Sequence, residues 1–510
     1  MIITGKEVKE KILQGINLVA DTVKPTLGPQ AKTVILQGNP PVIINDGVTI
    51  TKYISHEDPY VQMGVQLVQN LAGKAQDNTG DGTTTACILA QALCQKIADS
   101  DIADLAVLRK ELEDAKNIIL ENITSASEEV DDKSIVNVAT IAANNDGELG
   151  SLIAEVLQTI GRDGIISVEE GHSLKTTYEI KDGFEIEEGY FSHLMANDDG
   201  GKCILKNPLV VCTNHNIKQF QTIYPLLELS HANNRPLVIV CKDIQGSALS
   251  NLLMNIMQKT IECCVVKAPN FGDAQLDELD DITSLLGGKV FTDENNDDLS
   301  TALIENLGTC EKFIATKYSA TFIGGGENNG IVEDKIERLK ENLKDAESNY
   351  DEARLKKRLA KLNGGVAVIR VGAGSSIEMR ETKERLDDAL NATRAALQEG
   401  IVVGGGMGLL NARNELDYEV SNVGHSIVFE SLSAPIECLI ENSGLDKTSK
   451  KMFKKLTGVN GFNALTGTLS NLKRDGVMDP TLVVKSSFSV AMSIAMLFLS
   501  TDVAVLLPEE

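Results

Sequence analysis

The sequence contains no tryptophan, and aromatic residues make up only 4% of its 510 positions. Hydrophobic residues still reach 42%, so the cores must be built mainly from Val, Ile, Leu and Ala. Proline is scarce as well, with 12 residues against 42 glycines, which favours pivots and tight backbone approaches over stiff linkers. At roughly 150 residues per domain, the length predicts about three domains.

Patterns of metal-binding and disulfide proteins are also missing. The nine cysteines contain no C-x-x-C pair, and the six histidines show no ligand spacing. We therefore expect reduced, buried thiols in a reducing cytoplasm, and no metal site made by protein ligands alone. The N-terminus lacks the pattern of a signal or transit peptide. Polar residues interrupt the most apolar stretch, 490–507, which predicts a buried helix followed by a buried strand and no membrane span.

Positive charge is in short supply. Lys and Arg number 48 against 73 Asp and Glu, and the formal net charge is −25. Binding to nucleic acid or to an anionic membrane depends on cationic side chains, so we expect neither partner. The excess acid favours solubility through mutual repulsion.

Hydrophobic periodicity predicts that the chain begins with helices. A helix over 6–24 has apolar residues at spacings of three and four, and Pro25 ends it. The further elements predicted for this part of the chain are strands over 33–36 and 42–44, helices over 60–76 and 84–98, and a polar boundary over 127–134.

The middle of the chain alternates between short strands and helices, which indicates an α/β layered domain. The predicted strands are 165–168, 209–212, 237–241 and 262–267, and the predicted helices are 216–232, 246–259 and 273–286. Residues 331–347 and 350–362 carry heptad-like spacing. Ser348 and Asp351 match a capping box between them, so we predict a helical hairpin.

Gly80-Asp81-Gly82-Thr83-Thr84-Thr85 lies between two predicted helices. Glycine lets the backbone approach a phosphate closely, and a threonine-capped helix start offers free N–H groups to an anion. Asp81 is the natural Mg²⁺ ligand, because Mg²⁺ takes one or two carboxylates and completes its shell with phosphate and water. By itself this loop is a common motif.

Further segments strengthen the hypothesis of a nucleotide site. Thr26–Pro29 and Gly404–Gly406 offer turns and bare backbone, and Asp46 and Asp388 are candidates for orienting water. Phosphoryl transfer depends on positioning and charge neutralisation. The chain has no G-x-x-x-x-G-K-[ST] motif, so the site is not of the Walker type.

These segments resemble the group I (GroEL-type) chaperonins, in the order and at roughly the spacing of that family, over essentially the whole chain. The matching segments are Val23–Pro29, Asn45-Asp46-Gly47, Gly80–Thr85, Val265–Pro269, Asn363–Val368, Asp388–Arg394 and Gly404–Gly406.

The resemblance implies a multi-domain α/β chaperonin fold. It comprises a mainly α-helical equatorial ATPase domain (1–128 and 399–510), a small α/β intermediate domain (129–182 and 366–398) and an α/β apical substrate-binding domain (183–365). Gly183 and Gly365 would be hinges, since a hinge needs a few residues that absorb the φ/ψ change.

The function implied is that of an ATP-hydrolysing chaperone that binds non-native proteins in a ring-shaped chamber. Its cofactors would be ATP and Mg²⁺, with K⁺ as a further candidate. Its partners would be non-native polypeptides, copies of itself in one or two seven-membered rings, and a GroES-like co-chaperonin. The expected location is the cytoplasm of a bacterium or of a phage-infected host.

Roles of single residues follow from the same resemblance. Asp388 would prepare the attacking water, Asp46 would assist it and Asp81 would hold Mg²⁺. The nucleotide would be bound by Thr26, Leu27, Gly28, Pro29, Asn45, Gly47, Gly82, Thr83, Thr84, Thr85, Ile141, Gly404, Gly405, Asn463, Ala464 and Asp479. A groove for clients and co-chaperonin would be formed by Tyr190, Leu194, Met195, Tyr224, Leu227, Leu249, Leu253 and Met254.

The sequence departs from the family at several of these positions. Asn45 replaces a lysine, so one cation near the phosphates is missing. Glu128 replaces a proline at the lower hinge, and Glu188 and Ser376 replace an Arg–Glu pair between subunits. Leu194 and Met195 replace aromatic residues of the groove, and the chain ends without the usual Gly-Met-rich tail. We therefore expect cooperativity that differs from the family norm.

Two alternatives stay open at the level of sequence. A small-molecule kinase or other ATPase could use the same loop, and it would be a monomer or dimer. A ring-forming holdase with weak ATPase activity could have lost turnover. Particle size separates the first from a chaperonin, and phosphate release separates the second.

Overall fold

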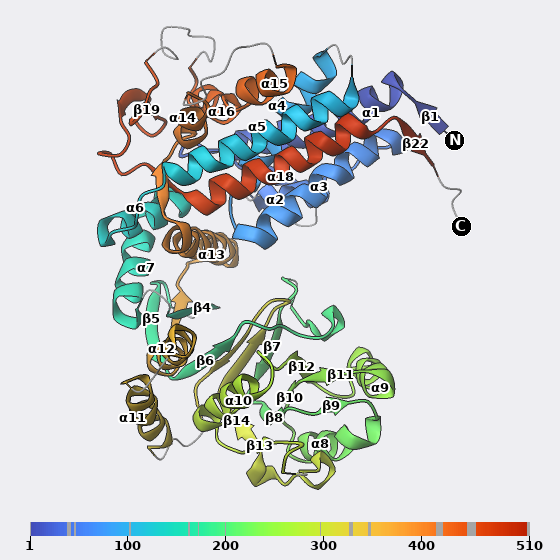
Figure 1. The fold of residues 1–510 in the computed structure, drawn as a ribbon, viewed down its shortest axis with the longest axis vertical. Helices are drawn as coiled ribbons and strands as arrows, with labels where there is room; N and C mark the ends of the chain where they lie inside the picture. Colours follow the sequence, from blue (N-terminus) through green and yellow to red (C-terminus); the bar gives the residue numbers. More distant parts are fainter. Residues whose placement is uncertain are drawn as a thin grey trace. The chain divides into compact units, whose positions relative to one another are not determined.

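The computed structural model (Figure 1) describes residues 2–37, 42–44, 47–100, 104–161, 164–171, 173–198, 200–295, 297–325, 330–344, 348–414, 422–445 and 455–506. The chain forms two compact units. Unit 1 combines both ends of the chain, residues 1–155 and 373–510, and unit 2 contains residues 156–372.

Unit 1 is built around a layer of long helices, which Figure 1 shows side by side: α1 (Lys6–Val23), α3 (Pro59–Thr79), α4 (Thr83–Asp99), α5 (Leu105–Ser125) and α18 (Thr481–Ser500). In α1 the apolar residues predicted to share one face are buried. Helices α1 and α3 cross at Gly15 and Gly64. A Cβ at Gly64 would collide with the backbone of Ile12, so glycine sets how closely the two helices approach.

Helix α18 is the apolar C-terminal helix that the sequence predicts. Two helical stretches of unit 1, Val423–Asn442 and Thr481–Ser500, are long and apolar enough to cross a membrane, and 61% and 56% of their windows are buried in the protein. That burial is typical of core helices. The strand after α18, β22 (Val503–Val505), was expected to be buried, which is wrong, because Val503 and Val505 are about half exposed.

The other elements of unit 1 surround this layer. Antiparallel pairs join β1 (Ile2–Thr4) to β22, β2 (Val34–Leu36) to β3 (Val42–Ile44), β18 (Ile401–Val403) to β21 (Met478–Pro480), and β19 (Asn460–Asn463) to β20 (Thr468–Asn471). The helices are α2 (Gly47–Tyr53), α6 (Asp132–Ala142), α13 (Ser376–Glu399), α14 (Met407–Asn414), α15 (Val423–Ser431) and α16 (Ala434–Asn442), with the short η1 (Lys24–Thr26) after α1. Helix α7 (Gly147–Ile160) runs from unit 1 into unit 2.

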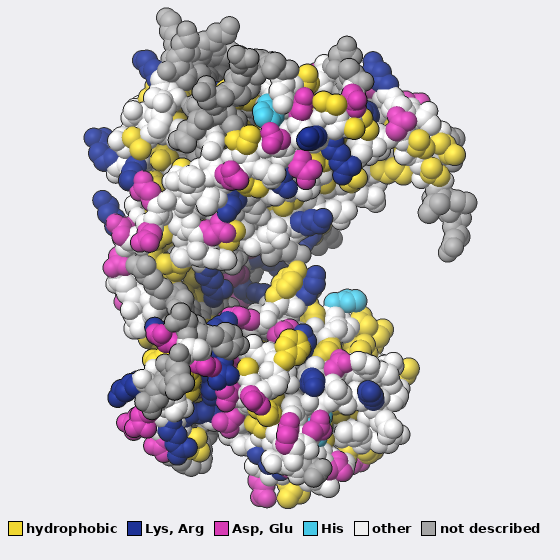
Figure 2. Space-filling view, viewed as in Figure 1, with side chains coloured by type: hydrophobic (Ala, Val, Ile, Leu, Met, Phe, Trp, Pro, Cys, Tyr) yellow, Lys and Arg dark blue, Asp and Glu magenta, His cyan; other side chains and the backbone are white. Residues whose placement is uncertain are grey.

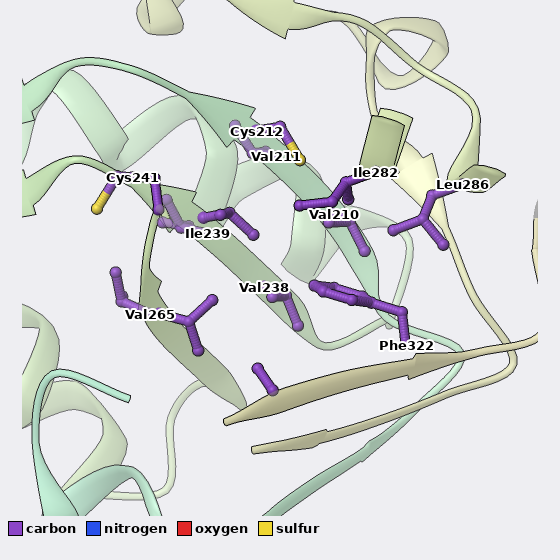
Figure 3. Close-up of a cluster of buried hydrophobic side chains, with 14 of the residues drawn as sticks. Val210, Val211, Cys212, Val238, Ile239, Cys241, Val265, Ile282, Leu286 and Phe322 are labelled. Carbon is purple, nitrogen blue, oxygen red and sulfur yellow. The ribbon is translucent and has the colours of Figure 1, made fainter. Parts of the chain in front are cut away.

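Unit 2 contains a five-stranded sheet of order β12-β10-β8-β13, with β14 (Gly308–Thr309) also on β8. The strands β8 (Leu209–Thr213), β10 (Leu237–Cys241), β12 (Cys263–Lys267) and β13 (Val290–Phe291) are parallel. Helices α8 (Phe220–Ala232), α9 (Gly246–Met257) and α10 (Asp273–Leu286) connect them. Figure 3 shows Val210 beside Ile282 of α10, and Val238 and Ile239 in the same buried cluster.

Two smaller sheets and the parallel pair of β9 (Asn216–Ile217) and β11 (Asp243–Ile244) complete unit 2. One of the sheets has the order β4 (Ile165–Glu170), β17 (Val366–Val371), β5 (Thr177–Lys181), and the other has the order β6 (Gly183–Ile186), β16 (Ala320–Ile323), β15 (Lys312–Ala315), β7 (Cys203–Lys206). The short elements η2 (His193–Met195), η3 (Leu299–Thr301) and η4 (Ile304–Asn306) lie between them in the chain.

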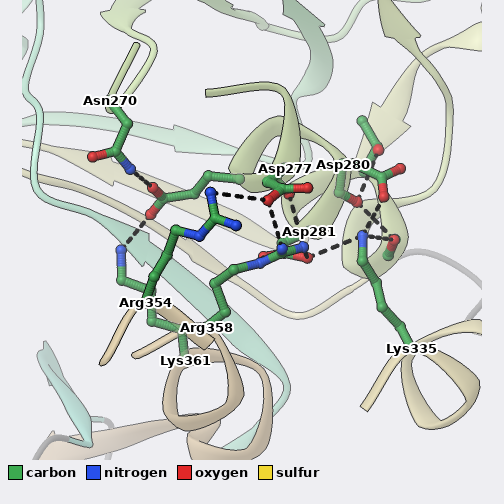
Figure 4. Close-up of polar contacts among 11 residues, drawn as sticks. Asn270, Asp277, Asp280, Asp281, Lys335, Arg354, Arg358 and Lys361 are labelled. Carbon is green, nitrogen blue, oxygen red and sulfur yellow. Dashed lines mark hydrogen bonds and ion pairs between the residues drawn. The ribbon is translucent and has the colours of Figure 1, made fainter. Parts of the chain in front are cut away.

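The predicted helical hairpin is present as α11 (Ile331–Lys344) and α12 (Asn349–Gly364), which pack on each other and on α10. Ser348 caps α12 by accepting a hydrogen bond from the Asp351 amide at 3.0 Å. Charged side chains join this hairpin to α10 (Figure 4). Arg358 of α12 donates to Asp281 of α10 at 2.7 and 2.9 Å, although Asp281 is fully buried.

The multi-domain α/β fold class is confirmed, and most element boundaries agree with the sequence within a few residues. One further expectation is corrected. The window 216–232 begins as strand β9, because Ile217 pairs with Ile244 before α8 starts at Phe220. Within the predicted polar boundary 127–134, Glu128 pairs with Ile401 in a β-bridge, and α6 begins at Asp132.

Candidate functional site

A cavity of about 510 Å³ lies within unit 1. Its walls come from segments far apart in the sequence: the loop after α1, the loop between α3 and α4, the end of α6, one face of α13, and the strands and turns around β18, β19 and β21. The predicted residues that line it are Thr26, Leu27, Gly28, Pro29, Gly47, Asp81, Gly82, Thr83, Thr84, Thr85, Ile141, Asp388, Gly405, Asn463, Ala464 and Asp479.

Three predicted residues are not among those that line the cavity. Gly404 lies behind it, where a Cβ would sit 2.8 Å from the Asp479 carboxylate. Asn45 and Asp46 lie outside the described residues. Their predicted roles therefore stay predictions from the resemblance.

The loop between α3 and α4 has the form that a phosphate cradle requires. Gly80 and Gly82 both adopt left-handed backbone, at φ of 66° and 84°, which residues with a Cβ rarely do. A Cβ at Gly82 would also collide with Ser487 and Val483. Thr83, the first residue of α4, is 6% exposed, and its hydroxyl has no hydrogen-bond partner among the described residues. The loop thus ends in an unsatisfied polar group beside the free N–H groups of a helix start.

The loop after α1 forms a second wall, and α16 holds it in place. The Asn442 carboxamide donates to the carbonyl oxygens of Lys24 and Leu27, each at 2.9 Å. Gly28 is left-handed, at φ 89°, and a Cβ there would collide with Leu439 of α16. These contacts set the course of the backbone from Thr26 to Pro29 beside the cavity.

The Asp479 carboxyl is in an environment that disfavours its ionised form. Burial raises the pKa of its carboxyl to about 6, and the nearby negative charge of Asp81 adds to this rise. A hydrogen bond from the Gly405 amide works in the opposite direction. The side chain is partly open to the cavity, so a bound cation or a hydroxyl donor could relieve the cost of its charge.

Helix α13 brings Asp388 to the cavity from the side of α6, on which it packs. One turn further on, the Asn391 carboxamide lies against Gly80, where any Cβ would collide with it. The helix that carries the candidate water-orienting carboxylate is therefore also in contact with the glycine loop.

The charged side chains among the described residues that line the cavity are all acidic. Four carboxylates line it, those of Asp81, Asp388, Asp475 and Asp479, and none of the described residues that line it is Lys or Arg. A triphosphate could enter such a site only together with cations. The carboxylates fit that requirement, because hard cations such as Mg²⁺ prefer oxygen ligands and share them with phosphate.

Several lining residues were not predicted. Asn137, Asn144 and Asn145 come from α6 and the turn after it, and Asp475 lies close to Asn463, whose Nδ2 is 3.2 Å from its carboxylate. The only signal for Asn144 and Asn145 was the Asn-Asn pair, which is typical of turns. Their neighbour Ile141 was identified through the resemblance alone.

The predicted groove residues of unit 2 divide by exposure. Tyr224 on α8 is 50% exposed, Met254 on α9 is 57% exposed and Leu194 is 38% exposed. Leu249 and Leu253 on α9 are partly buried, as is Tyr190. Figure 2 shows hydrophobic side chains at the surface over α9.

Met195 and Leu227 do not lie on that surface. They are 2% and 7% exposed, and the Met195 sulfur accepts a hydrogen bond from the Val265 amide at 3.3 Å. Both side chains belong to the hydrophobic core of unit 2.

The two candidate hinge glycines lie side by side in unit 2. A Cβ at Gly183 would collide with Val366, the residue after Gly365, and Gly365 is left-handed at φ 59°. A Cβ at Gly365 would sit 3.0 Å from the carbonyl oxygen of Lys181. At both positions, a side chain would require a local shift of the neighbouring residues.

Two of the residues at which the sequence departs from the family form ion pairs within their own unit. The Glu128 carboxylate pairs with Lys473 at 2.5 Å in unit 1, and Glu188 pairs with Lys267 at 3.3 Å in unit 2. Ser376 begins α13.

Residues 19–507 match a model of the TCP-1/cpn60 chaperonin family. The fold is similar to two crystal structures of the chaperonin gp146 from the bacteriophage EL 2 (Pseudomonas aeruginosa), both determined in the presence of ATP-BeFx. One has a TM-score of 0.74 at 20% identity and covers 100% of both chains. The other has a TM-score of 0.66 at 19% identity and covers 100% of this chain and 99% of that one.

Proposed function

Because the chain belongs to the TCP-1/cpn60 chaperonin family, we propose that it is an ATP-dependent molecular chaperone, which binds non-native proteins in unit 2 and hydrolyses ATP in unit 1. The observation that carries this proposal is the cavity of unit 1, which gathers the glycine loop, a candidate metal ligand and a candidate water-orienting carboxylate in one place. We expect the protein to work in the cytoplasm, as a ring of identical subunits and with a GroES-like co-chaperonin.

The nucleotide would be held mainly by backbone. Its phosphates would lie on the loop from Gly80 to Thr85, where the amides at the start of α4 and the unsatisfied Thr83 hydroxyl can donate hydrogen bonds. The base and ribose would lie between the loop after α1 and the turns that carry Asn463 and Asp479.

Asp81 would hold Mg²⁺ together with the nucleotide, and the ion would supply positive charge that balances the phosphates. Asp388 would accept a hydrogen bond from the attacking water and so orient it toward the terminal phosphate. The helix α13 would fix the distance, because Asn391 of that helix already contacts Gly80.

The test of the proposed chemistry is the substitution Asp388→Ala, assayed by phosphate release and by nucleotide binding. We expect steady-state hydrolysis to fall by about 100-fold or more, since a group that acts on the water contributes roughly 10²–10⁴-fold. Affinity for ATP should change little, because the phosphate loop is intact. Lys383→Ala, on the same helix but outside the cavity, is the matched control.

Unchanged turnover in Asp388→Ala would remove the role of Asp388. A wild-type protein that suppresses aggregation without releasing phosphate would indicate the ring-forming holdase instead. A monomer or dimer that phosphorylates a small molecule would indicate the kinase alternative.

Client binding would use the exposed apolar side chains of α8 and α9. Met is flexible and polarisable, and it suits binding to many sequences. We expect Met254→Glu to weaken the suppression of aggregation of an unfolded test protein several-fold, without loss of ATPase activity. Leu303→Glu replaces an equally exposed apolar residue of unit 2, 58% against 57%, and should have little effect. Equal effects of the two variants would argue against the groove.

A further inference from the structure

We propose that Asn144 and Asn145 bind the terminal phosphate of the nucleotide through their side-chain carboxamides and stabilise the charge that develops there during hydrolysis. This inference rests on the proposed function. It goes beyond it by assigning two residues that neither the sequence motifs nor the resemblance identified.

The first observation is the backbone of the turn after α6. Asn144 and Asn145 are consecutive left-handed residues, at φ of 57° and 65°. Their amides donate to the carbonyl oxygens of Ile141 at 3.1 Å and Thr140 at 2.8 Å, which locks the turn onto the end of the helix. Left-handed backbone costs a residue with a Cβ on the order of 1 kcal/mol, and Asn tolerates it best.

The second observation concerns the side chains. Both residues line the cavity, Asn144 exposed and Asn145 partly buried. Neither carboxamide makes a hydrogen bond to another residue of the part of the chain that the structure describes. Two amide groups on a fixed backbone are therefore available to a ligand, and no internal hydrogen bond would have to break first.

The third observation is the charge of the cavity. Four carboxylates line it, and no Lys or Arg is present among its described lining residues. The transferred phosphoryl group nevertheless needs donors beyond the metal ion, because charge spreads over its oxygens in the transition state. Uncharged N–H donors on a rigid turn can supply this, and one preorganised donor of this kind contributes roughly 10²–10³-fold to turnover.

The alternative explanation is that the left-handed residues serve only to join α6 to α7. Glycine would serve that purpose at lower cost. The other left-handed asparagines among the described residues, Asn207, Asn234 and Asn270, occur singly, and none of them lines the cavity. Within this part of the chain, only the adjacent pair combines left-handed backbone with carboxamides that line the site and make no internal hydrogen bond.

The experiment compares Asn144→Gly and Asn145→Gly with the control Asn234→Gly. Glycine keeps the left-handed backbone and removes the carboxamide. We expect each cavity variant to lower kcat about 100- to 1,000-fold. ATP affinity should fall relative to ADP affinity, while ADP affinity stays within about twofold, since ADP lacks the terminal phosphate. The control should match the wild type. Asn145→Asp, of the same size but anionic, should lose more activity than Asn145→Gly.

Thermal unfolding separates binding from a structural role. The glycine variants should unfold at the same temperature as the wild type or above it. Wild-type kcat and ATP/ADP affinity ratio in both glycine variants would overturn the inference, as would an equal loss of ATP and ADP binding together with a lower unfolding temperature. If the wild type hydrolyses ATP and the variants match it, only this inference is lost. If the wild type binds no nucleotide, the proposed function is lost as well.

Discussion

At the scale of single residues, the site places carboxylates close together. Asp479 and Asp81 repel each other, and the pKa of Asp479 is raised to about 6 mainly because the side chain is buried. Ionised Asp479 therefore costs folding free energy as long as no ligand balances its charge. A residue that lowers the stability of the nucleotide-free protein is expected at a site where its charge is needed for ligand binding.

The pH dependence of stability tests this cost. The pKa of Asp479 is higher in the folded protein than the ordinary 3.8, so the folded state binds the extra proton between about pH 4 and 6. Above pH 6 the carboxylate is charged and destabilises the fold. We expect Asp479→Asn to stabilise the nucleotide-free protein at pH 8 by on the order of 1–3 kcal/mol, with a gain that shrinks as the pH falls from 6 to 4.

The measurement is the thermal unfolding midpoint at pH 8, 6 and 4.5, with Asp99→Asn at the end of α4 as the control. The Asp479→Asn variant should also bind nucleotide more weakly than the wild type. A stabilisation that does not depend on pH would show that the charge of Asp479 is not its source.

At the scale of elements, α10, α11 and α12 are joined by ion pairs around one buried carboxylate (Figure 4). The Asp281 carboxylate forms ion pairs with Arg358 of α12 at 2.7 Å and with Lys335 of α11 at 3.0 Å. Arg358 also reaches Asp277 at 2.8 Å. A buried pair of this kind is costly to break, because the remaining charge cannot be solvated.

We expect Arg358→Met to destabilise unit 2 by about 3 kcal/mol, since Lys335 still compensates part of the Asp281 charge. Hydrogen exchange should accelerate in α10, α11 and α12 first. Lys356→Met on the same helix removes only an exposed pair with Glu352 and should change stability by less than about 0.5 kcal/mol. Similar exchange in the two variants would show that the buried pair does not hold the hairpin.

At the scale of the whole molecule, unit 1 exposes two short strand pairs with apolar side chains. Ile2, Val503 and Val505 on β1 and β22 are 61%, 51% and 49% exposed, and Ile35 on β2 is 69% exposed. Figure 2 shows hydrophobic side chains at the surface over β1 and β22. Neither pair has a third strand among the described residues. Open edges with apolar side chains favour pairing with another chain, which agrees with the ring assembly proposed above.

We expect Ile35→Lys to convert the assembly into smaller species, because a charge at a strand edge opposes pairing. Light scattering after size exclusion measures the mass. Val107→Lys changes a 53% exposed residue that belongs to α5 and to neither strand pair, and it should leave the assembly intact. A full-size ring in Ile35→Lys would exclude β2 from the subunit contact.

The elements of this protein were largely determined by local sequence. The period of apolar residues in α1, the proline after it and the threonines after Gly82 act within a few residues, so they could be interpreted without a fold. The glycine loop and Asp388 were candidates for the same reason, although the family resemblance was needed to connect them.

Tertiary structure decided what surrounds those candidates. The family resemblance predicts that Met195 and Leu227 lie in the groove, yet long-range packing buries them. The pKa of Asp479 depends on Asp81, nearly 400 residues earlier in the chain. The backbone of Asn144 and Asn145 depends on how α6 ends. Exposure, charge proximity and backbone strain are set by contacts between distant segments, and for that reason only the folded chain shows them.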